Sequence, residues 1–233
     1  MLRRFHPTRR SAVAASLALP LGLAALLGGC KTPAAENRVA QADEYLKHNQ
    51  YKQAGDVIAP VVADQPGNWR AQFAYGRSML GQGDLEAARR SLDRAYRLKP
   101  DDVAVVTSLA ECMSRQKDVK DAYQLLRSFG KEFRSWRAYL ALSTVAEQSG
   151  DPDTAVTAAD DAIKVNEPVP GGRPSIEPYM RAAELAFKFG KEPAGVRRLR
   201  QAYGIIPDDP RIVEQLRAHG VTIGKETALP LGI

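Results

Sequence analysis

The chain has 233 residues and a formal net charge of +6, with 44% hydrophobic and 26% charged residues. This composition is that of a globular protein, and it excludes a wholly disordered chain, a collagen-like chain and a membrane protein with many spans. Aromatic residues make up only 7% of the chain, and alanine is abundant. We therefore expect closely packed helices.

The positive charge is concentrated at the N-terminus. The chain has 33 basic and 27 acidic residues, and residues 1–29 contain four of the arginines and no acid. The rest of the chain therefore carries only about +2, with its basic and acidic residues interleaved. A nucleic-acid-binding protein needs a basic stripe on its folded part, so we expect no nucleic-acid partner.

Residues 1–29 have the pattern of a secretory signal peptide. Ten residues with four arginines come before the 16-residue apolar stretch Ala12–Leu27, and the small residues Gly28 and Gly29 follow it. A transmembrane helix needs about 20 apolar residues, so this stretch fits a cleaved signal better. An uncleaved membrane anchor is the alternative. Thr8-Arg9-Arg10 is similar to a twin-arginine signal, but the residues after it fit that motif poorly, and we expect the general secretion route.

The signal peptide ends in Leu27-Gly28-Gly29-Cys30. This segment resembles the lipobox of bacterial lipoproteins, which implies cleavage between Gly29 and Cys30 and a diacylglycerol on the Cys30 thiol. Several acyl chains, at about 0.8 kcal/mol per buried methylene, give stable anchoring in a bilayer. Lys31 in place of aspartate implies, by analogy with enteric sorting and for a Gram-negative host, the periplasmic face of the outer membrane.

A pattern of similar residues recurs five times between about residues 36 and 209. Successive copies are offset by 34, 34, 33 and 40 residues. The small residues of the first helix are Ala42, Gly76, Ala110, Ser143 and Ala183, and the turn residues are Asn49, Gly83, Lys117, Gly150 and Gly190. Small residues let two helices approach closely, and the apolar residues that follow each turn fall on one helix face.

This pattern resembles the tetratricopeptide repeat (TPR), a 34-residue helix–turn–helix unit. The resemblance implies an all-α fold, a TPR α-solenoid of about five repeats plus a C-terminal capping helix. One hairpin cannot bury its apolar face alone, so the stacked hairpins are expected to share a continuous core. The expected segments are a lipidated cysteine and tether at 30–35, a solenoid at 36–220 with repeats at about 36–68, 69–102, 103–135, 136–168 and 176–209, a cap at 210–220, and a mobile tail at 221–233.

Two connections between helices contain residues that typically end one helix and start the next, and the third repeat lacks such residues. In Gly150-Asp151-Pro152, glycine is expected to end one helix, aspartate to cap the next and proline to take its first position. Asp209-Pro210 is expected to open the capping helix in the same way. The third copy has neither a turn glycine nor a closing proline, so its joins are expected to be less regular.

In this family the first helix of each hairpin lines a concave surface, chiefly through the second, fifth, ninth and twelfth repeat positions. The resulting candidate groove residues are Arg70, Phe73, Arg77, Arg137, Leu140, Met180, Glu184 and Phe187. The apolar members are expected to anchor an extended or helical peptide, and the arginines to pair with acids. Each residue could instead serve only packing or solvation. The fifth positions (Val39, Phe73, Thr107, Leu140 and Met180) hold no lysine, which excludes the carboxylate clamp of chaperone-docking members.

No pattern of catalytic, cofactor or metal residues is found, so we expect no enzyme, no cofactor and no small-molecule substrate. His48 and His219 have no cysteine or carboxylate at ligand spacing, and no lysine-serine or lysine-threonine pair follows Gly81-Gln82-Gly83. With Cys30 lipidated, Cys112 has no disulfide partner and is expected to be a buried helix residue. The insertion at 169–174 is either a contact loop or a tolerated lengthening of a connection.

The function expected from these resemblances is a membrane-anchored periplasmic scaffold that binds an unidentified envelope protein. Similar lipoproteins pilot secretin rings or support assembly of type IV or tight-adherence pili. Two alternatives remain, an activator of cell-wall or exopolysaccharide synthesis and a hydrolase of envelope polymers. The fold alone does not separate them.

Overall fold

Helices account for all the regular secondary structure in the computed structural model, which describes residues 33–168 and 170–231. The predicted signal peptide, cleavage site and Cys30 lie outside the described residues. Within these residues, no helix is both long and apolar enough to span a bilayer. The helices are α1 (Pro33–Lys47), α2 (Tyr51–Asp64), α3 (Trp69–Gln82), α4 (Leu85–Leu98), α5 (Val103–Arg115), α6 (Val119–Glu132), α7 (Trp136–Gln148), α8 (Pro152–Lys164), α9 (Glu177–Lys188), α10 (Glu192–Ile205) and α11 (Pro210–Ala218).

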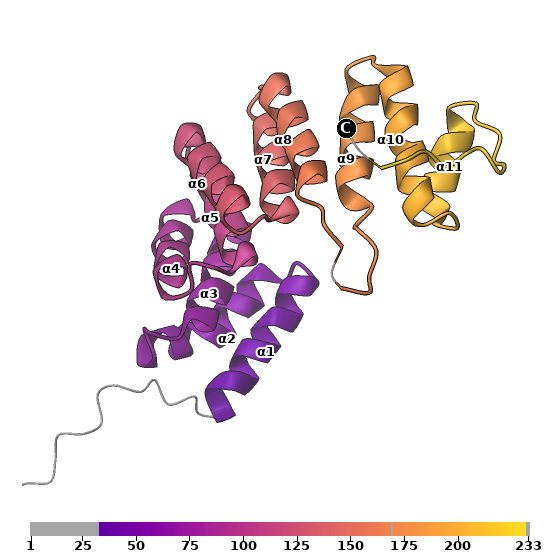
Figure 1. Ribbon diagram of the computed structural model, residues 1–233. Helices are drawn as coiled ribbons and strands as arrows, with labels where there is room; N and C mark the ends of the chain where they lie inside the picture. The colour runs from indigo at the N-terminus through magenta and orange to yellow at the C-terminus, as the bar shows by residue number, and fades with distance from the viewer. Residues whose placement is uncertain (1–32, 169, 232–233) are drawn as a thin grey trace, which may run out of the picture. The chain divides into compact units, whose positions relative to one another are not determined.

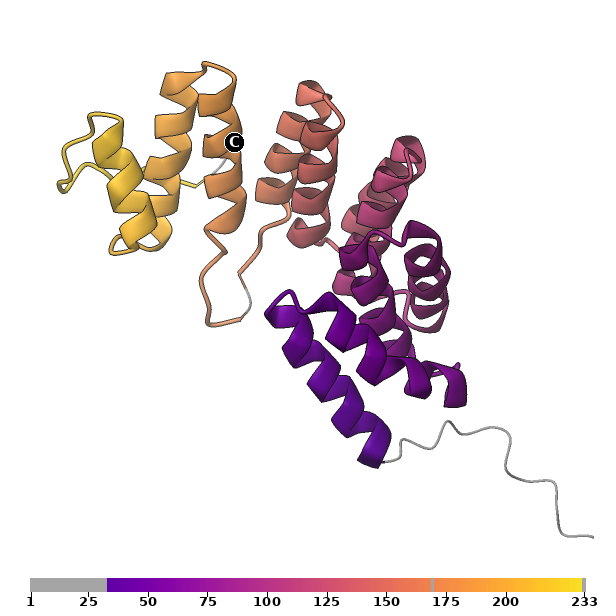
Figure 2. The same ribbon diagram turned by 180° about the vertical axis from the view of Figure 1, so that it is seen from behind.

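The first ten helices pair into five consecutive hairpins, and α11 packs against α10 (Figures 1 and 2). Below, α1, α3, α5, α7 and α9 are called the first helices, and α2, α4, α6, α8 and α10 the second helices. Each helix packs on the next one in the chain, and each first helix also contacts the following first helix. This arrangement confirms the predicted all-α stack of five hairpins with a capping helix.

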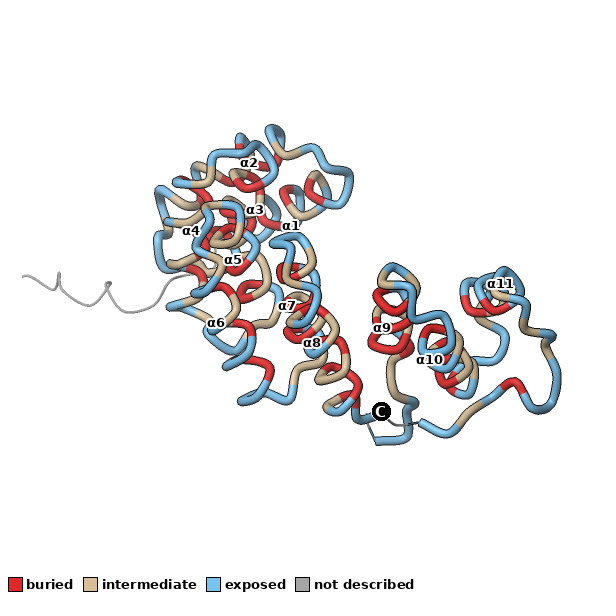
Figure 3. The backbone as a smooth tube through the Cα atoms, turned by 90° about the horizontal axis from the view of Figure 1, so that it is seen from above, coloured by how far each residue is buried: buried red, intermediate tan, exposed pale blue. Residues whose placement is uncertain are grey.

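The predicted column of small residues lies where the two helices of each hairpin meet. Ala42, Ala110, Ser143 and Ala183 are all 0% exposed. A methyl group on Gly76 would lie 2.7 Å from the side chain of Leu92 and 3.2 Å from its backbone nitrogen. Buried residues in Figure 3 follow the sides on which helices face one another. The column is small because α3 and α4 leave no room there for a larger side chain.

The five hairpin turns share one backbone conformation despite their different residues. The turn position has a φ of 57° at Asn49, 85° at Gly83, 74° at Lys117, 76° at Gly150 and 70° at Gly190. A left-handed residue after a helix lets the chain reverse and satisfies the last carbonyl groups. The third hairpin was expected to be less regular because it lacks this glycine. Its turn instead keeps the same geometry, with a lysine in a conformation that favours glycine.

Side-chain caps fix the starts of six helices. Asn68, Asp84, Asp102, Ser135, Asp151 and Asp209 each accept a hydrogen bond from a backbone N–H of the following first turn. The predictions for Asp151 and Asp209 are confirmed, and Pro152 and Pro210 each take the first helical position. Capping satisfies donors that have no partner inside the helix.

Both ends of the described chain differ from the expected segments. The tether was expected to reach residue 35, but α1 begins at Pro33, because proline is well suited to the first position of a helix. The mobility expected of the tail from residue 221 stays a prediction, and in the structure residues 226–230 lie along α10. Arg200 donates to the Thr227 carbonyl at 2.9 Å and accepts the Leu229 N–H on its own carbonyl at 3.1 Å. The tail takes part in these bonds through backbone groups, so no apolar pattern in its sequence predicts them.

The insertion between the fourth and fifth hairpins is tied down at both ends. The Asn166 side chain donates to the Ser175 carbonyl at 2.7 Å and accepts the Ser175 N–H at 3.0 Å. Arg173 donates to the carbonyl of Ile205 at 3.0 Å, at the C-terminal end of α10. A cation there also meets the negative end of the helix dipole. The insertion therefore bridges α8, α9 and α10.

Candidate functional site

The exposed side chains of the first helices form the candidate binding surface, called here the first-helix surface. Successive first helices contact one another, whereas successive second helices do not pack together to the same extent. In a stack built this way, the more closely spaced helices line the inner side. All eight predicted groove residues lie on first helices, on α3, α7 and α9. They divide into two groups with different surroundings.

On α3, two arginines flank a half-buried phenylalanine. The Arg70 guanidinium lies 5.4 Å from the ring centroid of Trp69, and the Arg77 guanidinium lies 5.6 Å from that of Phe73. Phe73 packs against the buried cluster that contains Leu80 and Leu92. No carboxylate of the described residues lies within ion-pair distance of either guanidinium. Helix α3 thus carries two arginines whose guanidinium groups lie over aromatic rings, and the N–H groups at their edges make no ion pair with a carboxylate of the described residues.

On α7 the same arrangement recurs at the same repeat position. The Arg137 guanidinium lies 4.5 Å from the ring centroid of Trp136. Leu140, one helical turn further on, is half-buried against the cluster around Leu142 and Phe129. Arg137, like Arg70, is exposed and has no carboxylate of the described residues at ion-pair distance. The structure thus repeats an arginine over tryptophan two hairpins apart.

An open pocket of about 290 Å³ lies beside Arg70, between α1 and α3. Its lining consists of Glu36, Val39, Ala40, Asp43, Asn68 and Arg70. Partial burial raises the pKa of Asp43, and the nearby charges of Arg77, Lys47 and Arg70 oppose that rise. Acidic and basic groups therefore alternate along this part of the surface.

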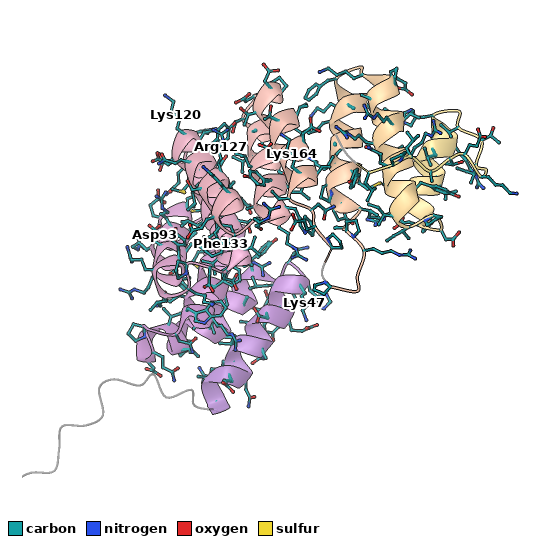
Figure 4. The ribbon with its side chains drawn as sticks, viewed as in Figure 1. Lys47, Asp93, Lys120, Arg127, Phe133 and Lys164 are labelled. Carbon is teal, nitrogen blue, oxygen red and sulfur yellow. The ribbon has the colours of Figure 1, made fainter. Side chains whose placement is uncertain are left out.

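A second open pocket, of about 390 Å³, lies beside Arg137. Its lining includes Trp136, Ser135 and the aromatic pair Phe129 and Phe133, whose ring centroids are 4.5 Å apart. Phe133 is 44% exposed, just beyond the end of α6 (Figure 4). Both pockets lie next to the capping residue and the arginine that open a first helix.

The predicted groove residues of α9 are engaged within the chain. Glu184 accepts from Arg181 at 2.9 Å. The Phe187 ring is stacked parallel to His219 with centroids 3.8 Å apart, and it covers Gly195 of α10. Met180 packs against the buried cluster of the last two hairpins. The α9 end of the first-helix surface therefore consists of side chains that already pack or form hydrogen bonds within the chain.

A network of charged side chains joins α7 to α9. Arg181 donates to the Ser143 hydroxyl at 3.1 Å and to Glu147 at 2.5 Å, and Lys188 donates to Glu147 at 2.6 Å. Hydrogen bonds from Lys188 and Arg181 lower the pKa of Glu147. The charges of this end are thus largely neutralised within the chain.

The sequence prediction missed two tryptophans and Arg181. Arg181 lies outside the repeat positions that usually face the groove, so its role depends on how α7 and α9 pack. The tryptophans did leave a signal, because the tripeptide Trp-Arg-Ala occurs at Trp69–Ala71 and again at Trp136–Ala138, each time directly after a capping residue. Among the described residues, no group of three or more histidine, cysteine or acidic side chains is placed to hold a metal ion.

Comparisons with known proteins agree with this fold. Residues 39–103 and residues 79–146 each match a family model described as tetratricopeptide repeat. A thermophilic TPR protein of Thermus thermophilus is 17% identical, with a TM-score of 0.58 over 80% of this chain and 98% of that chain. A TPR protein of Parabacteroides merdae is 12% identical, with a TM-score of 0.58 over 79% of this chain and 70% of that chain. The pilF protein of Pseudomonas aeruginosa is 17% identical, with a TM-score of 0.55 over 80% of this chain and 86% of that chain. The search of curated protein sequences finds no significant match.

Residues 39–146 therefore carry tetratricopeptide repeats, and the described hairpins form a TPR solenoid. At these identities the solved structures establish the fold alone. Solenoids of this kind use extended surfaces to bind other proteins, which makes the first-helix surface the candidate site for a protein partner.

Proposed function

We propose that this chain is a membrane-anchored periplasmic lipoprotein whose first-helix surface binds another protein during assembly of an envelope machine, a pilus or a secretion system. The proposal places it at the outer membrane, held by acyl chains on Cys30. It assigns the chain a scaffold role without catalysis. The observation that carries the binding role is the row of arginines and half-buried apolar side chains on α3 and α7.

The lipid anchor rests on the sequence Leu27-Gly28-Gly29-Cys30 at the end of the apolar run. Replacement of Cys30 by alanine should abolish labelling with radioactive palmitate and move the protein from the membrane fraction to the soluble fraction or leave its signal uncleaved. Unchanged palmitate incorporation in Cys30→Ala would contradict the anchor. The other thiol, Cys112, is fully buried, so Cys112→Ala is the matched control and should keep the label.

Site-specific photocrosslinking in the native cell envelope tests the binding role. Thr107 on α5 lies at the groove position between the α3 and α7 arginines, and Arg94 is exposed on α4. A photoreactive residue at 107 should capture a component of a pilus or secretion machine, and the same residue at 94 should not. Capture of a cell-wall or polysaccharide synthase at 107 would replace the assembly role with the regulatory alternative. Absence of any adduct specific to position 107 would contradict the groove.

A further inference from the structure

We propose that the Arg70, Arg77 and Arg137 side chains bind carboxylates, so that the first-helix surface takes an acidic peptide segment whose carboxylates flank apolar residues. This inference rests on the proposed binding role and specifies the chemistry of the partner. It differs from a clamp for a chain-terminal carboxylate, because that clamp needs lysine at the fifth repeat position and this chain has none.

The three arginines are held in place before any partner arrives. Each guanidinium lies over an aromatic ring, with 5.4 Å to Trp69, 5.6 Å to Phe73 and 4.5 Å to Trp136. Stacking uses the flat face of a guanidinium and leaves its N–H edges free for a carboxylate. A side chain already held in its bound geometry loses less conformational entropy on binding. These arginines are therefore suited to accept acidic side chains.

The two ends of the surface differ in how their charges are neutralised. On α7 and α9, Arg181 and Lys188 are satisfied by Glu147 and Glu184, so an incoming carboxylate would have to displace a bond already made. Around α3 and the start of α7, no carboxylate of the described residues lies within ion-pair distance of Arg70, Arg77 or Arg137, and Asp43 acts on the two α3 arginines only from farther away. Charge complementarity therefore places an acidic partner on the α3, α5 and α7 part of the surface.

The spacing of the groups favours a peptide over a densely charged polymer. Arg70 and Arg77 are seven residues apart, about 10 Å along the helix axis, and the Phe73 side chain lies between them. Asp43 lies near both arginines and Glu36 lines the same pocket as Arg70. A continuous row of phosphates would be repelled by these carboxylates. Carboxylates separated by apolar side chains can meet the arginines and also cover Phe73 and Leu140.

The two tryptophans of the chain give a direct readout, because they are the residues under Arg70 and Arg137. The probe is a synthetic peptide of glutamate, leucine and alanine, titrated into the full-length protein in detergent while tryptophan emission is recorded. The matched peptide carries glutamine in place of every glutamate. Saturable quenching or a wavelength shift is expected with the glutamate peptide and not with the glutamine peptide. Trp69→Phe and Trp136→Phe then assign the signal to the two sites.

Variants separate these arginines from general positive charge. The triple change Arg70→Ala, Arg77→Ala and Arg137→Ala should weaken binding of the glutamate peptide by about tenfold or more. The control triple removes the same charge from exposed α4 positions, with Arg90→Ala, Arg94→Ala and Arg97→Ala, and should leave affinity unchanged. Other exposed cations, such as Lys120 and Arg127 on α6 (Figure 4), remain in both variants. Circular dichroism checks that both variants keep wild-type helicity.

The remaining outcomes overturn the inference. They are equal weakening by both triple variants, equal binding of the glutamine peptide, tighter binding of inorganic polyphosphate through the same arginines, or no binding of the glutamate peptide. If the helical content of the triple variant falls, Arg70→Lys with Arg137→Lys keeps the charge, loses the planar stack, and should still weaken binding. If crosslinking at Thr107 captures a machine component while the peptide does not bind, the proposed function stands and the carboxylate assignment fails.

Discussion

The amide of Asn166 is bonded twice to the backbone of Ser175, nine residues further along the chain. Its nitrogen donates to the Ser175 carbonyl at 2.7 Å, and its oxygen accepts the Ser175 N–H at 3.0 Å. Asn166 is only 7% exposed. The Asn166 side chain therefore joins the two ends of the insertion through a pair of hydrogen bonds.

Replacement of Asn166 by alanine should lower the free energy of unfolding by about 1–3 kcal/mol, because two backbone groups of Ser175 lose their partner. Urea unfolding followed by circular dichroism measures this loss. The neighbouring exposed change Glu167→Gln should cost less than about 1 kcal/mol, since it weakens only a surface ion pair with Arg134. Equal stability of the Asn166→Ala variant and the wild type would show that the bridge does not hold the loop.

Lys117 occupies a left-handed turn position that glycine fills in three other hairpins. Lys117→Gly should raise the free energy of unfolding by about 0.5–1 kcal/mol, because relief of the left-handed strain outweighs the added freedom of the unfolded chain. The urea midpoint should rise without a change in slope. Gly83→Ala, the reverse change at the matching position, should lower the midpoint. A lower midpoint for Lys117→Gly would mean that contacts of the lysine side chain outweigh the strain.

The network around Glu147 predicts a dependence of stability on pH. The folded pKa of Glu147 lies below its ordinary value of 4.5, chiefly through hydrogen bonds from Lys188 and Arg181. A lowered folded pKa contributes stability above about pH 4.5 that is lost as the pH falls through the folded value. Glu147→Gln should therefore cost about 1–2 kcal/mol at pH 7 and nothing at a pH below that value.

Urea unfolding of the wild type and of Glu147→Gln, from pH 7 down to a pH below the folded pKa of Glu147, measures the difference in their free energies of unfolding. Glu184→Gln is the matched control, because Glu184 also pairs with Arg181 but its side chain is 64% exposed. It should change the stability at pH 7 by less than about 0.5 kcal/mol. A constant difference between Glu147→Gln and the wild type at every pH would contradict the assignment.

The Cys112 thiol should be unreactive in the folded protein. It is fully buried, and burial raises its pKa to about 11. Because the thiolate is the reactive form, a Cys30→Ala variant, in which Cys112 is the single thiol, should react with Ellman's reagent at pH 8 only after urea is added. Rapid labelling without urea would mean that α4 and α5 separate readily.

The stack of hairpins was predictable because each hairpin depends on local signals. Ala42, Gly76 and Ala110 recur at a fixed spacing, and Asp151-Pro152 and Asp209-Pro210 carry their helix starts in the sequence. The turn at Lys117 was not predictable, since its conformation comes from the helices on both sides and not from the residue itself. The contacts of the tail with Arg200 were not predictable, because on the tail side they use backbone groups, which any sequence supplies.

For the candidate site, the repeat pattern assigned the eight predicted groove residues to first helices, where the structure has them, but it did not indicate which of them remain available. Arg70 and Arg137 are exposed, as a groove residue should be. Phe187, by contrast, is covered by His219, which lies beyond the five repeats and so follows no repeat pattern. Contacts between repeat and cap depend on tertiary packing, and a periodic pattern carries no information about them.

The contacts between successive helices also bear on how the molecule opens. Among the helices of the described residues, extensive packing joins only those that are one or two places apart in the chain. In such a one-dimensional array, cooperativity passes from neighbour to neighbour, and terminal units fray before the interior does. A ligand that spans α3, α5 and α7 would couple three adjacent hairpins. Amide hydrogen exchange would then slow across the middle of the array and remain fast at its ends.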